Sequence, residues 1–370
     1  MNVVFINEFS FSYVGGVELH ILNLGRELLK QGANVTLVCR AHRKPGGWQP
    51  SQEGFRIVHA PKLRDLYAFL RGEAQNIDVC HAHMSRKPYA LCGLLFSRLL
   101  GIPTVFTPHC FYPSEELGKR LAKRAYDETL SRLTFLLSRR VINLTPRDQQ
   151  DSVERGMQMS QSRIIPNSIR LSPLQNAQPG GFREKHGIRG DFLLHVGRFA
   201  KEKCIDFLVR NHASFEDLGL LLIGQDDGQL ENVQQLVNSL ELSNRVYMFE
   251  KISFEDVYSA YREARGLVMA SRNEGLPTVV LEAAVFGAFT VAPKVGGIPY
   301  IIEEEKTGYL YDWGDSSGYV ACVRRMLAGP ARIDAATRDR FLERFSWEAN
   351  ALKIAAVYSE ISSCSTESAG

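Results

Sequence analysis

The stretch SRNEGLPTVVLEAAVFG, residues 271–287, shows how this chain is built. The apolar run Gly266–Met269 precedes it and is typical of a buried strand. Pro277 suits the first turn of a helix, where its missing N–H would have no partner anyway, and Gly287 suits the position after the last turn. The residues between them are apolar almost all round, as in a helix that packs against a sheet. The stretch therefore predicts a strand, a loop and a helix of an α/β protein.

The same alternation of short apolar runs with helical patterns continues along both halves of the chain. The expected strands of the first half are Asn2–Ile6, Asn34–Cys39, Ile77–His81, Pro103–Thr107 and Val141–Leu144. Those of the second half are Asp191–Val196, Leu218–Ile223, Arg245–Phe249 and Gly266–Met269. The expected helices include Val17–Lys30, Pro88–Leu100, Cys204–Arg210, Glu231–Ser239 and Phe254–Ala264. Strands that alternate with helices form parallel sheets, so we expect two Rossmann-like domains.

The 370 residues exceed the size at which a single hydrophobic core usually stops growing. From Pro166 to about Gly190 the chain is rich in Pro, Gly, Ser, Asn and Gln, which predicts a domain boundary. We expect an N-terminal domain over residues 1–168 and a C-terminal domain over residues 169–346. The amphipathic pattern over about residues 347–362 predicts a last helix that packs back on the N-terminal domain.

The composition favours a protein of a reducing, cytoplasmic compartment. Seven cysteines are scattered without a C-x-x-C pair, which argues against a disulfide framework or a zinc ribbon. The N-terminus lacks the cationic and long apolar regions of a signal peptide. The longest apolar stretch, Tyr89–Phe106, is broken by Arg98, Gly101 and Pro103, so no membrane span is expected.

Charge is distributed unevenly along the chain. Residues 1–165 carry 22 Lys and Arg against 14 Asp and Glu, a net +8, whereas the remainder has 22 against 27, a net −5. The stretch Gly118–Arg140 is basic and amphipathic, so it is either a peripheral contact with an anionic membrane or a solvated helix face. No repeat of basic and aromatic residues appears, and we expect no nucleic acid partner.

The start of the helix in the opening stretch predicts an anion site. The amides of Gly275, Leu276 and Thr278 surround a helix N-terminus, where unpaired N–H groups and the helix dipole favour a phosphate. Glu282 lies inside the same apolar helix, and a buried carboxylate needs partners. Two neighbouring ribose hydroxyls would satisfy it.

These residues, with others in order along the chain, carry a family resemblance. Glu274 and Glu282 are separated by seven residues that include G-L-P and end in Leu281, and this spacing resembles that of the retaining glycosyltransferases of family 4, which have the GT-B fold. Further similar segments are GGVE (15–18), HAH (81–83), TPH (107–109), IIPNS (164–168), HVGRFAKEK (195–203), LLIGQDDG (221–228), VGGIPYIIEEEKTGYL (295–310) and FSW (345–347). The resemblance implies two Rossmann-like domains whose parallel sheets face a central cleft.

The resemblance also implies roles for the two glutamates and one histidine. Glu274 would contact hydroxyls of the donor sugar, and Glu282 would hold the ribose. His109 would lie near the transferred sugar and the leaving group, so Glu274 and His109 are the candidate catalytic residues. The alternative is that the glutamates are a surface acid and a core acid paired with an arginine.

The donor diphosphate would be held by two cations and by backbone groups. Arg198 and Lys203 resemble the pair that clamps it, and a fixed guanidinium and ammonium stabilise the charge that a departing diphosphate gains. Gly15 and Gly16 would let the first helix approach a phosphate closely, as would the helix start at Pro277. Without the resemblance, we would interpret Arg198 and Lys203 as solvated surface cations. The glycine spacing is not the G-x-G-x-x-G of nicotinamide enzymes.

Two groups of residues raise the alternative of a metal site. Potential zinc ligands are Cys80, His81, His83, His109 and Cys110, but strand ends seldom supply a closed tetrahedral set. Asp226 and Asp227 are adjacent, unlike the D-x-D of metal-dependent sugar transferases. We therefore expect no metal and no cofactor beyond a nucleoside diphosphate sugar as co-substrate.

The sequence and the resemblance together predict a metal-independent glycosyltransferase that moves a hexose-type sugar from a nucleoside diphosphate to a glycan or lipid-linked acceptor. The resemblance implies that the configuration is retained. The resemblance suggests bacterial-type surface polysaccharide or glycolipid synthesis, with the enzyme cytoplasmic or peripheral at the inner membrane. The alternative is a nucleotide-sugar epimerase or hydrolase on the same fold. Tyr300, Cys204 and the pair Glu250 and Lys251 depart from the family pattern, which weakens any transfer of donor identity.

Overall fold

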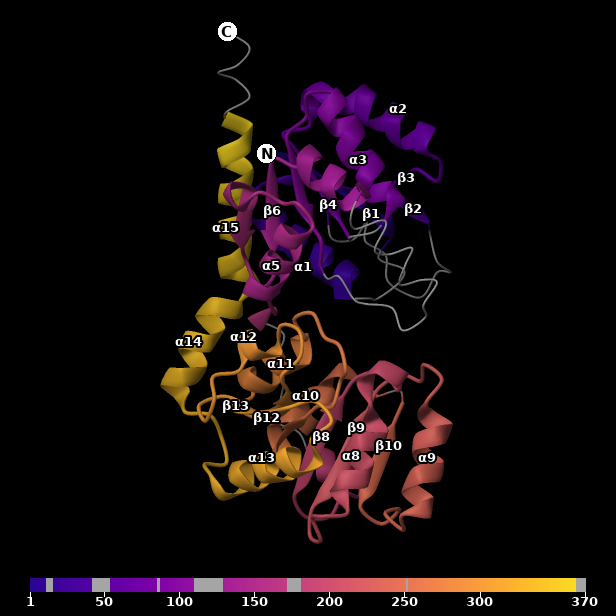
Figure 1. Ribbon diagram of the computed structural model, residues 1–370, viewed down its shortest axis with the longest axis vertical. Coiled ribbons are helices and arrows are strands. Elements are labelled where there is room, and N and C mark those ends of the chain that lie inside the picture. The colour runs from indigo at the N-terminus through magenta and orange to yellow at the C-terminus, as the bar shows by residue number, and fades with distance from the viewer. Residues whose placement is uncertain are drawn as a thin grey trace. The chain divides into compact units, whose positions relative to one another are not determined.

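The computed structural model describes residues 1–10, 16–41, 54–84, 87–109, 129–171, 181–250 and 252–363. The chain divides into two compact units, Met1–Ser168 with Trp347–Gly370, and Ile169–Ser346. We call them unit 1 and unit 2 and describe each by itself (Figure 1).

Unit 1 is built on a seven-stranded, parallel sheet with the order β3-β2-β1-β4-β5-β6-β7. Its strands are β1 (Asn2–Phe9), β2 (Asn34–Ala41), β3 (Arg56–His59), β4 (Val79–His83), β5 (Thr104–Thr107), β6 (Arg140–Asn143) and β7 (Ser162–Ile164). Its helices are α1 (Gly16–Lys30), α2 (Leu63–Glu73), α3 (Pro88–Leu99), α5 (Pro146–Glu154) and α15 (Trp347–Ser363), with short 3₁₀ turns at Ala74–Asn76 and Met159–Gln161.

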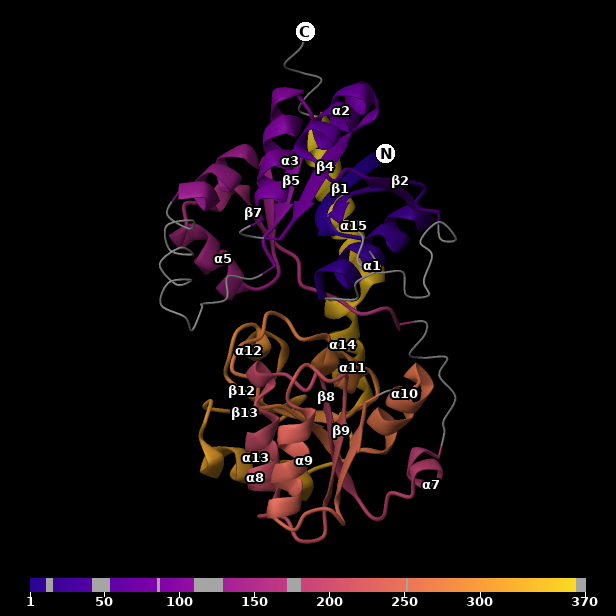
Figure 2. The same cartoon turned by 90° about the vertical axis from the view of Figure 1, so that its right-hand side faces the viewer.

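Helices cover both faces of this sheet. Successive side chains of a strand point to opposite faces, and here both sets are apolar. Val3 and Phe5 of β1 point to the core under α1 and α15, whereas Val4 and Ile6 point to the core under α2 and α3. Helix α15 packs along α1 through Trp347 and its apolar face (Figure 2). The last helix therefore belongs to the fold of unit 1, although 178 residues of unit 2 precede it in the chain.

Unit 2 has a six-stranded, parallel sheet with the order β10-β9-β8-β11-β12-β13. Its strands are β8 (Phe192–Val196), β9 (Gly219–Ile223), β10 (Val246–Phe249), β11 (Gly266–Val268), β12 (Phe289–Pro293) and β13 (Gly308–Tyr311). Its helices are α7 (Phe182–His186), α8 (Ile205–His212), α9 (Leu230–Ser239), α10 (Phe254–Glu263), α11 (Thr278–Val285), α12 (Ile298–Ile301), α13 (Ser316–Ala328) and α14 (Ala335–Phe345), with a 3₁₀ turn at Lys201–Lys203. The strands are mostly apolar, and β8, β9, β11 and β12 are almost fully buried, as in other sheets covered by helices, whereas the edge strand β10 is only partly buried.

Because all strands in a unit are parallel, the loops that leave their carboxyl ends gather at one edge of the sheet. In unit 2 these loops are residues 197–204, 224–229, 269–277 and 294–297, and we call them the carboxyl-edge loops. In unit 1 the corresponding edge carries His83 at the end of β4 and His109 just after β5.

The predicted class, two Rossmann-like α/β units with parallel sheets, is confirmed. One boundary differs: Pro277 does not begin the helix but precedes it as its N-cap, because its backbone is extended (φ −72°, ψ 119°). Within the described ranges, no helix is both long and apolar enough to cross a membrane.

Candidate functional site

The carboxyl-edge loops of unit 2 are packed against one another at their backbones. The Gly197 N–H donates to the Ile223 carbonyl at 2.9 Å, which extends the pairing of β8 with β9 into the loops. A Cβ atom on Gly224 would lie 1.8 Å from the carbonyl oxygen of Gly197, so only glycine fits there. The Arg272 N–H donates to the Glu202 carbonyl at 2.8 Å and joins the third loop to the first.

Lys203 and Glu274, which are 71 residues apart in the sequence, form an ion pair across two of these loops. The Lys203 Nζ donates to the Glu274 Oε1 at 2.6 Å. The two side chains are only 20% and 9% exposed, so water screens this pair less than it would a surface pair. The structure thus brings together Lys203, which is predicted to hold the diphosphate, and Glu274, which is predicted to contact the sugar.

The backbone of Glu274 is fixed by the loop after β12. Gly296 adopts φ +54°, and a Cβ atom on it would lie 1.7 Å from the Glu274 carbonyl oxygen. Next to it, the Gly297 N–H donates to the Gly275 carbonyl at 2.7 Å. The carboxylate of Glu274 is therefore held from both sides, through its side chain by Lys203 and through its backbone by Gly296.

Arg198 lies at the same edge and is held by two carboxylates of its own. Its guanidinium pairs with Glu202 at 2.7 Å and with Asp227 on the next loop. The arginine side chain is 51% exposed, so it remains open to solvent. Arg198 and Lys203 thus flank the short turn between them, and both already have carboxylate partners.

Helix α11 presents its N-terminus at this edge. Leu276 and Pro277 are the buried residues that lead into Thr278, its first residue, and the hydrocarbon ring of Pro277 has no group that could cap the helix. The first N–H groups of a helix have no partner within it, and the helix dipole makes this end a favourable place for an anion. Gly275, Leu276 and Thr278 therefore lie where the sequence predicts the phosphate contacts.

Glu282, one turn further along α11, has a partner that the sequence did not reveal. The hydroxyl of Tyr261 on α10 donates to the Glu282 Oε2 at 3.0 Å. Burial raises the pKa of the Glu282 carboxyl, and the hydrogen bond from Tyr261 lowers it in part. Burial also raises the pKa of Tyr261, so its proton stays on the hydroxyl and is available for donation. The alternative named an arginine as the partner of this core acid, whereas the structure gives it a tyrosine hydroxyl.

The adjacent residues Asp226 and Asp227 both have structural roles. The Asp226 Oδ1 accepts the backbone N–H groups of Gly228, Gln229 and Leu230 at 2.9, 3.1 and 3.0 Å, which caps the start of α9. These hydrogen bonds, that from Leu230 foremost, lower the pKa of Asp226. Asp226 thus caps α9, and Asp227 pairs with Arg198.

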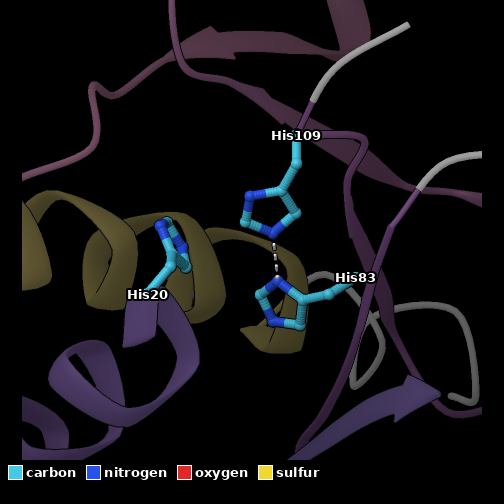
Figure 3. A group of neighbouring side chains, drawn as sticks. All are labelled: His20, His83 and His109. Carbon is cyan, nitrogen blue, oxygen red and sulfur yellow. Dashed lines mark hydrogen bonds between the residues drawn. The ribbon is translucent and has the colours of Figure 1, made fainter. Parts of the chain in front are cut away.

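In unit 1, His109 is buried together with two other histidines (Figure 3). The His109 Nε2 lies 3.1 Å from the His83 Nδ1, and the ring centroid of His20 on α1 lies 4.8 Å from that of His109. His109 adopts φ +66°, a left-handed conformation that is uncommon outside glycine. Burial is the main reason that the pKa of His109 lies well below its usual value, so its imidazole is neutral near pH 7.

The other predicted residues of unit 1 are placed less fully. Gly16 is exposed and begins α1, and a Cβ atom on it would meet nothing within 4 Å. Gly15 lies outside the described residues, as do Cys110 and the basic stretch up to residue 128. His81 serves the core, because its two ring nitrogens contact the Tyr358 hydroxyl at 2.6 Å and the Thr107 hydroxyl at 2.8 Å.

Sequence reasoning missed three residues of these sites: Tyr261, Asp227 as the partner of Arg198, and His20. Tyr261 and Asp227 lie 21 and 29 residues from their partners, so no local pattern connects them. His20 has a weak signal, since it is a histidine within a helical pattern next to the apolar residues Ile21 and Leu24.

Two family models match the chain in succession. Residues 14–172 match the model of Glycosyltransferase Family 4, and residues 182–344 match that of Glycosyl transferases group 1. Each match covers most of one compact unit.

Curated relatives extend over nearly the whole chain. The phosphatidylinositol N-acetylglucosaminyltransferase GPI3 subunit of Saccharomyces cerevisiae is 24% identical over 386 residues, covering 99% of this chain and 84% of the relative. The D-inositol 3-phosphate glycosyltransferase of Corynebacterium diphtheriae is 24% identical over 400 residues, covering 94% of this chain and 90% of the relative.

Solved structures share the architecture. Sucrose-phosphate synthase from Thermosynechococcus elongatus has a TM-score of 0.78 at 22% identity and covers 98% of this chain and 99% of its own. Anabaena HepE, in complex with UDP, has a TM-score of 0.80 at 19% identity and covers 97% of this chain and 100% of its own. With both units matched in the same order as in the family and with the fold shared, the chain belongs to the group 1 glycosyltransferases of the GT-B fold.

Proposed function

We propose that this glycosyltransferase takes its sugar from a nucleoside diphosphate that binds at the carboxyl-edge loops of unit 2, without a metal ion. The observation that carries the proposal is the ion pair of Lys203 with Glu274, which lies at the same edge as Arg198 and the N-terminus of α11. Cations and helix amides suit the phosphates, and carboxylates suit hydroxyl groups.

Donor binding exchanges partners within this set. The diphosphate oxygens replace the carboxylate beside Lys203, so that Glu274 turns to accept hydrogen bonds from hydroxyls of the sugar. Arg198, which is more exposed, likewise exchanges its carboxylate partners Glu202 and Asp227 for diphosphate oxygens. Glu282, oriented by Tyr261, accepts from the ribose hydroxyls. The cations then stand where negative charge develops on the departing nucleoside diphosphate, which is where they stabilise the transition state.

The transfer itself exchanges one bond at the anomeric carbon for another. The acceptor hydroxyl oxygen bonds to that carbon as the bond from the carbon to the diphosphate oxygen breaks. The proton of the acceptor hydroxyl passes to the leaving phosphate, and the configuration of a hexose-type sugar is retained, as the family resemblance suggests. His109, for which the resemblance implies a place near the transferred sugar, is a neutral imidazole and would contribute hydrogen bonds rather than charge.

The names of the relatives support a choice of substrates. Two of them name an inositol-bearing acceptor, phosphatidylinositol in one and D-inositol 3-phosphate in the other. Solved relatives are named with UDP and with UDP-glucose. We therefore propose a uridine donor and an acceptor with an inositol phosphate headgroup, in preference to a growing surface polysaccharide. A lipid-linked acceptor of this kind fits an enzyme that works at a membrane surface.

The first test is binding of UDP, GDP, ADP and their sugars by calorimetry in the presence of a chelator. One nucleotide should bind the wild type, and Arg198→Ala and Glu282→Ala should each weaken binding by about tenfold or more, the scale of a lost hydrogen bond to a charged group. Arg189→Ala is the matched control, because Arg189 is exposed and precedes β8 at the opposite edge of the sheet. If no nucleotide binds without metal, or if the three variants behave alike, the proposed donor site is wrong.

The acceptor is tested by transfer from the nucleotide sugar that binds. Labelled product should form with an inositol phosphate or with phosphatidylinositol in vesicles and should be absent with neutral oligosaccharides. Release of free sugar or of an epimer at full rate without any acceptor would instead favour an epimerase or hydrolase.

A further inference from the structure

The three buried histidines of unit 1 come from three separate elements and meet at one point (Figure 3). His20 lies on α1, His83 at the end of β4 and His109 just after β5. They are 2%, 0% and 8% exposed. One ring nitrogen of each lies within 4.8 Å of one ring nitrogen of each of the others. We call this set the histidine cluster.

The hydrogen bonds of Asn167 determine which nitrogen of His20 carries the proton. The backbone N–H of Ser168 donates to the Asn167 Oδ1 at 3.0 Å, which identifies that atom as an acceptor. The same oxygen lies 3.3 Å from the His20 Nδ1, so Nδ1 holds the hydrogen and donates it. The His20 Nε2 is therefore a bare lone pair, and it is buried with no hydrogen-bond partner among the described residues.

The ring of His83 also has a nitrogen without a partner. The His83 Nδ1 and the His109 Nε2 lie 3.1 Å apart and contact each other, while the His83 Nε2 is buried without a partner in the described ranges. Burial lowers the pKa of His20 to about 4 and lowers the pKa of His83 and His109 well below the usual value. All three rings are thus neutral at pH 7, which is the form in which imidazole binds metals.

We propose that His20, His83 and His109 together bind a divalent transition-metal ion of the Zn²⁺ class, with a fourth coordination position left open. Three imidazoles are the ligands of such ions and not of Mg²⁺ or Ca²⁺, which take oxygen ligands. The bond from the His20 Nδ1–H to Asn167 is the kind of outer contact that orients a metal-binding histidine.

The distances require only a small adjustment. Nitrogen ligands about 2.1 Å from a tetrahedral ion lie roughly 3.3 Å apart. The His83 and His109 nitrogens already lie 3.1 Å apart, and the ligand nitrogens of the three rings all lie within 4.8 Å of one another. Movements of about 1.5 Å or less therefore bring the wider separations to the tetrahedral distance. The ion would replace the mutual contact of two neutral rings and would give the His20 lone pair a partner.

The direct test is titration of chelator-treated, full-length protein with Co²⁺, followed by the visible absorption bands of the metal. We expect one Co²⁺ per chain, strong bands typical of tetrahedral geometry, and their loss when Zn²⁺ is added. His20→Ala and His83→Ala should each weaken Co²⁺ binding by about tenfold or more, since outer contacts alone are worth that much. His59→Ala is the control, because His59 is an exposed histidine of the same unit.

Substitution of a buried ring can also unfold the protein, so His20→Gln and His83→Gln accompany the alanine variants, and thermal unfolding without metal is measured for each. Folded variants that bind Co²⁺ as the wild type does would overturn the proposal, and so would a wild type that binds no Co²⁺ or binds it without tetrahedral bands. Either result would leave the cluster as a set of neutral rings that contact one another.

Metal binding should also affect sugar transfer, and this expectation rests on the proposed function. Because the ion uses His109, Zn²⁺ should inhibit transfer, a chelator should restore it, and His20→Gln should make it insensitive to Zn²⁺. The two ideas fail separately: Co²⁺ binding without any sugar transfer would refute the proposed function only, whereas transfer without Co²⁺ binding would refute the metal site only.

Discussion

Gly296 combines a left-handed backbone conformation with a close approach to Glu274, a residue of the proposed donor site. Substitution to alanine places a side chain in a left-handed conformation, which costs about 1–3 kcal/mol, and sets its Cβ against the carbonyl of Glu274. Because that contact fixes Glu274 beside Lys203, we expect Gly296→Ala to lower both the stability and the affinity for UDP. Urea unfolding and calorimetry measure the two effects.

Gly187→Ala is the matched control for this substitution. Gly187 also has a positive φ, +67°, but a Cβ atom there would meet nothing within 4 Å, so its variant has the conformational cost alone. We expect it to retain wild-type affinity for UDP. Equal losses of stability and of affinity in the two variants would show that the contact with Glu274 has no special effect.

Tyr261 is the second residue with a defined expectation. Tyr261→Phe removes the hydrogen bond that partly offsets the effect of burial on the Glu282 carboxyl, so the pKa of Glu282 should rise further. A protonated Glu282 accepts ribose hydroxyls less well, and we expect UDP affinity to fall by about tenfold, the scale of one hydrogen bond to a charged group. The loss should grow as the pH falls, which binding measured at several pH values checks.

The control for Tyr261→Phe is Tyr258→Phe, on the same helix α10. The ring of Tyr258 also packs against Phe286, with centroids 5.7 Å apart, but no hydrogen bond joins it to Glu282 in the described contacts. The Tyr258 variant should bind UDP as the wild type does. A Tyr261 variant with unchanged affinity at every pH would mean that Glu282 needs no orientation.

At the scale of elements, most strands and helices could be predicted from the local sequence pattern. The run Phe192–Val196 and the helix Leu230–Ser239 lie within a residue or two of where apolar periodicity predicts them. The start of α11 at Thr278 was misplaced because proline tolerates both the N-cap and the first turn, and only its ψ of 119° distinguishes them. The strands β3, β7, β12 and β13 were not predicted, and each has only three to five residues.

The sites show where such reasoning stops. Parallel strands send their loops to one edge, so the sequence could place Arg198, Glu274 and the start of α11 together. It could not show that Glu274 pairs with Lys203 or that Tyr261 bonds to Glu282, because these contacts depend on side-chain direction across elements that are not adjacent in sequence. The same holds for His20, which lies on α1 and meets His109, just after β5, only in the folded unit.

At the scale of the whole molecule, buried neutral histidines make stability depend on pH. Burial lowers the pKa of His20, His195 and His212 from 6.5 to about 4. Between these values the unfolded chain binds protons that the folded chain does not, so folding is favoured above pH 6.5 and loses free energy as the pH falls towards 4. Each such histidine contributes up to about 3 kcal/mol to this loss. Carboxylates with lowered pKa, such as Asp226, add to it only below about pH 4.

His212 gives this expectation a test within unit 2. Its Nε2–H donates to the Leu218 carbonyl at 2.8 Å, a bond that the amide of glutamine can replace. We expect urea unfolding at pH 7.5, 6 and 5 to show that His212→Gln loses less stability on acidification than the wild type, whatever its stability at pH 7.5. His59→Gln, at an exposed position, should follow the wild type. If all three proteins lose stability in parallel, the carboxylates and not the buried histidines govern the response to acid.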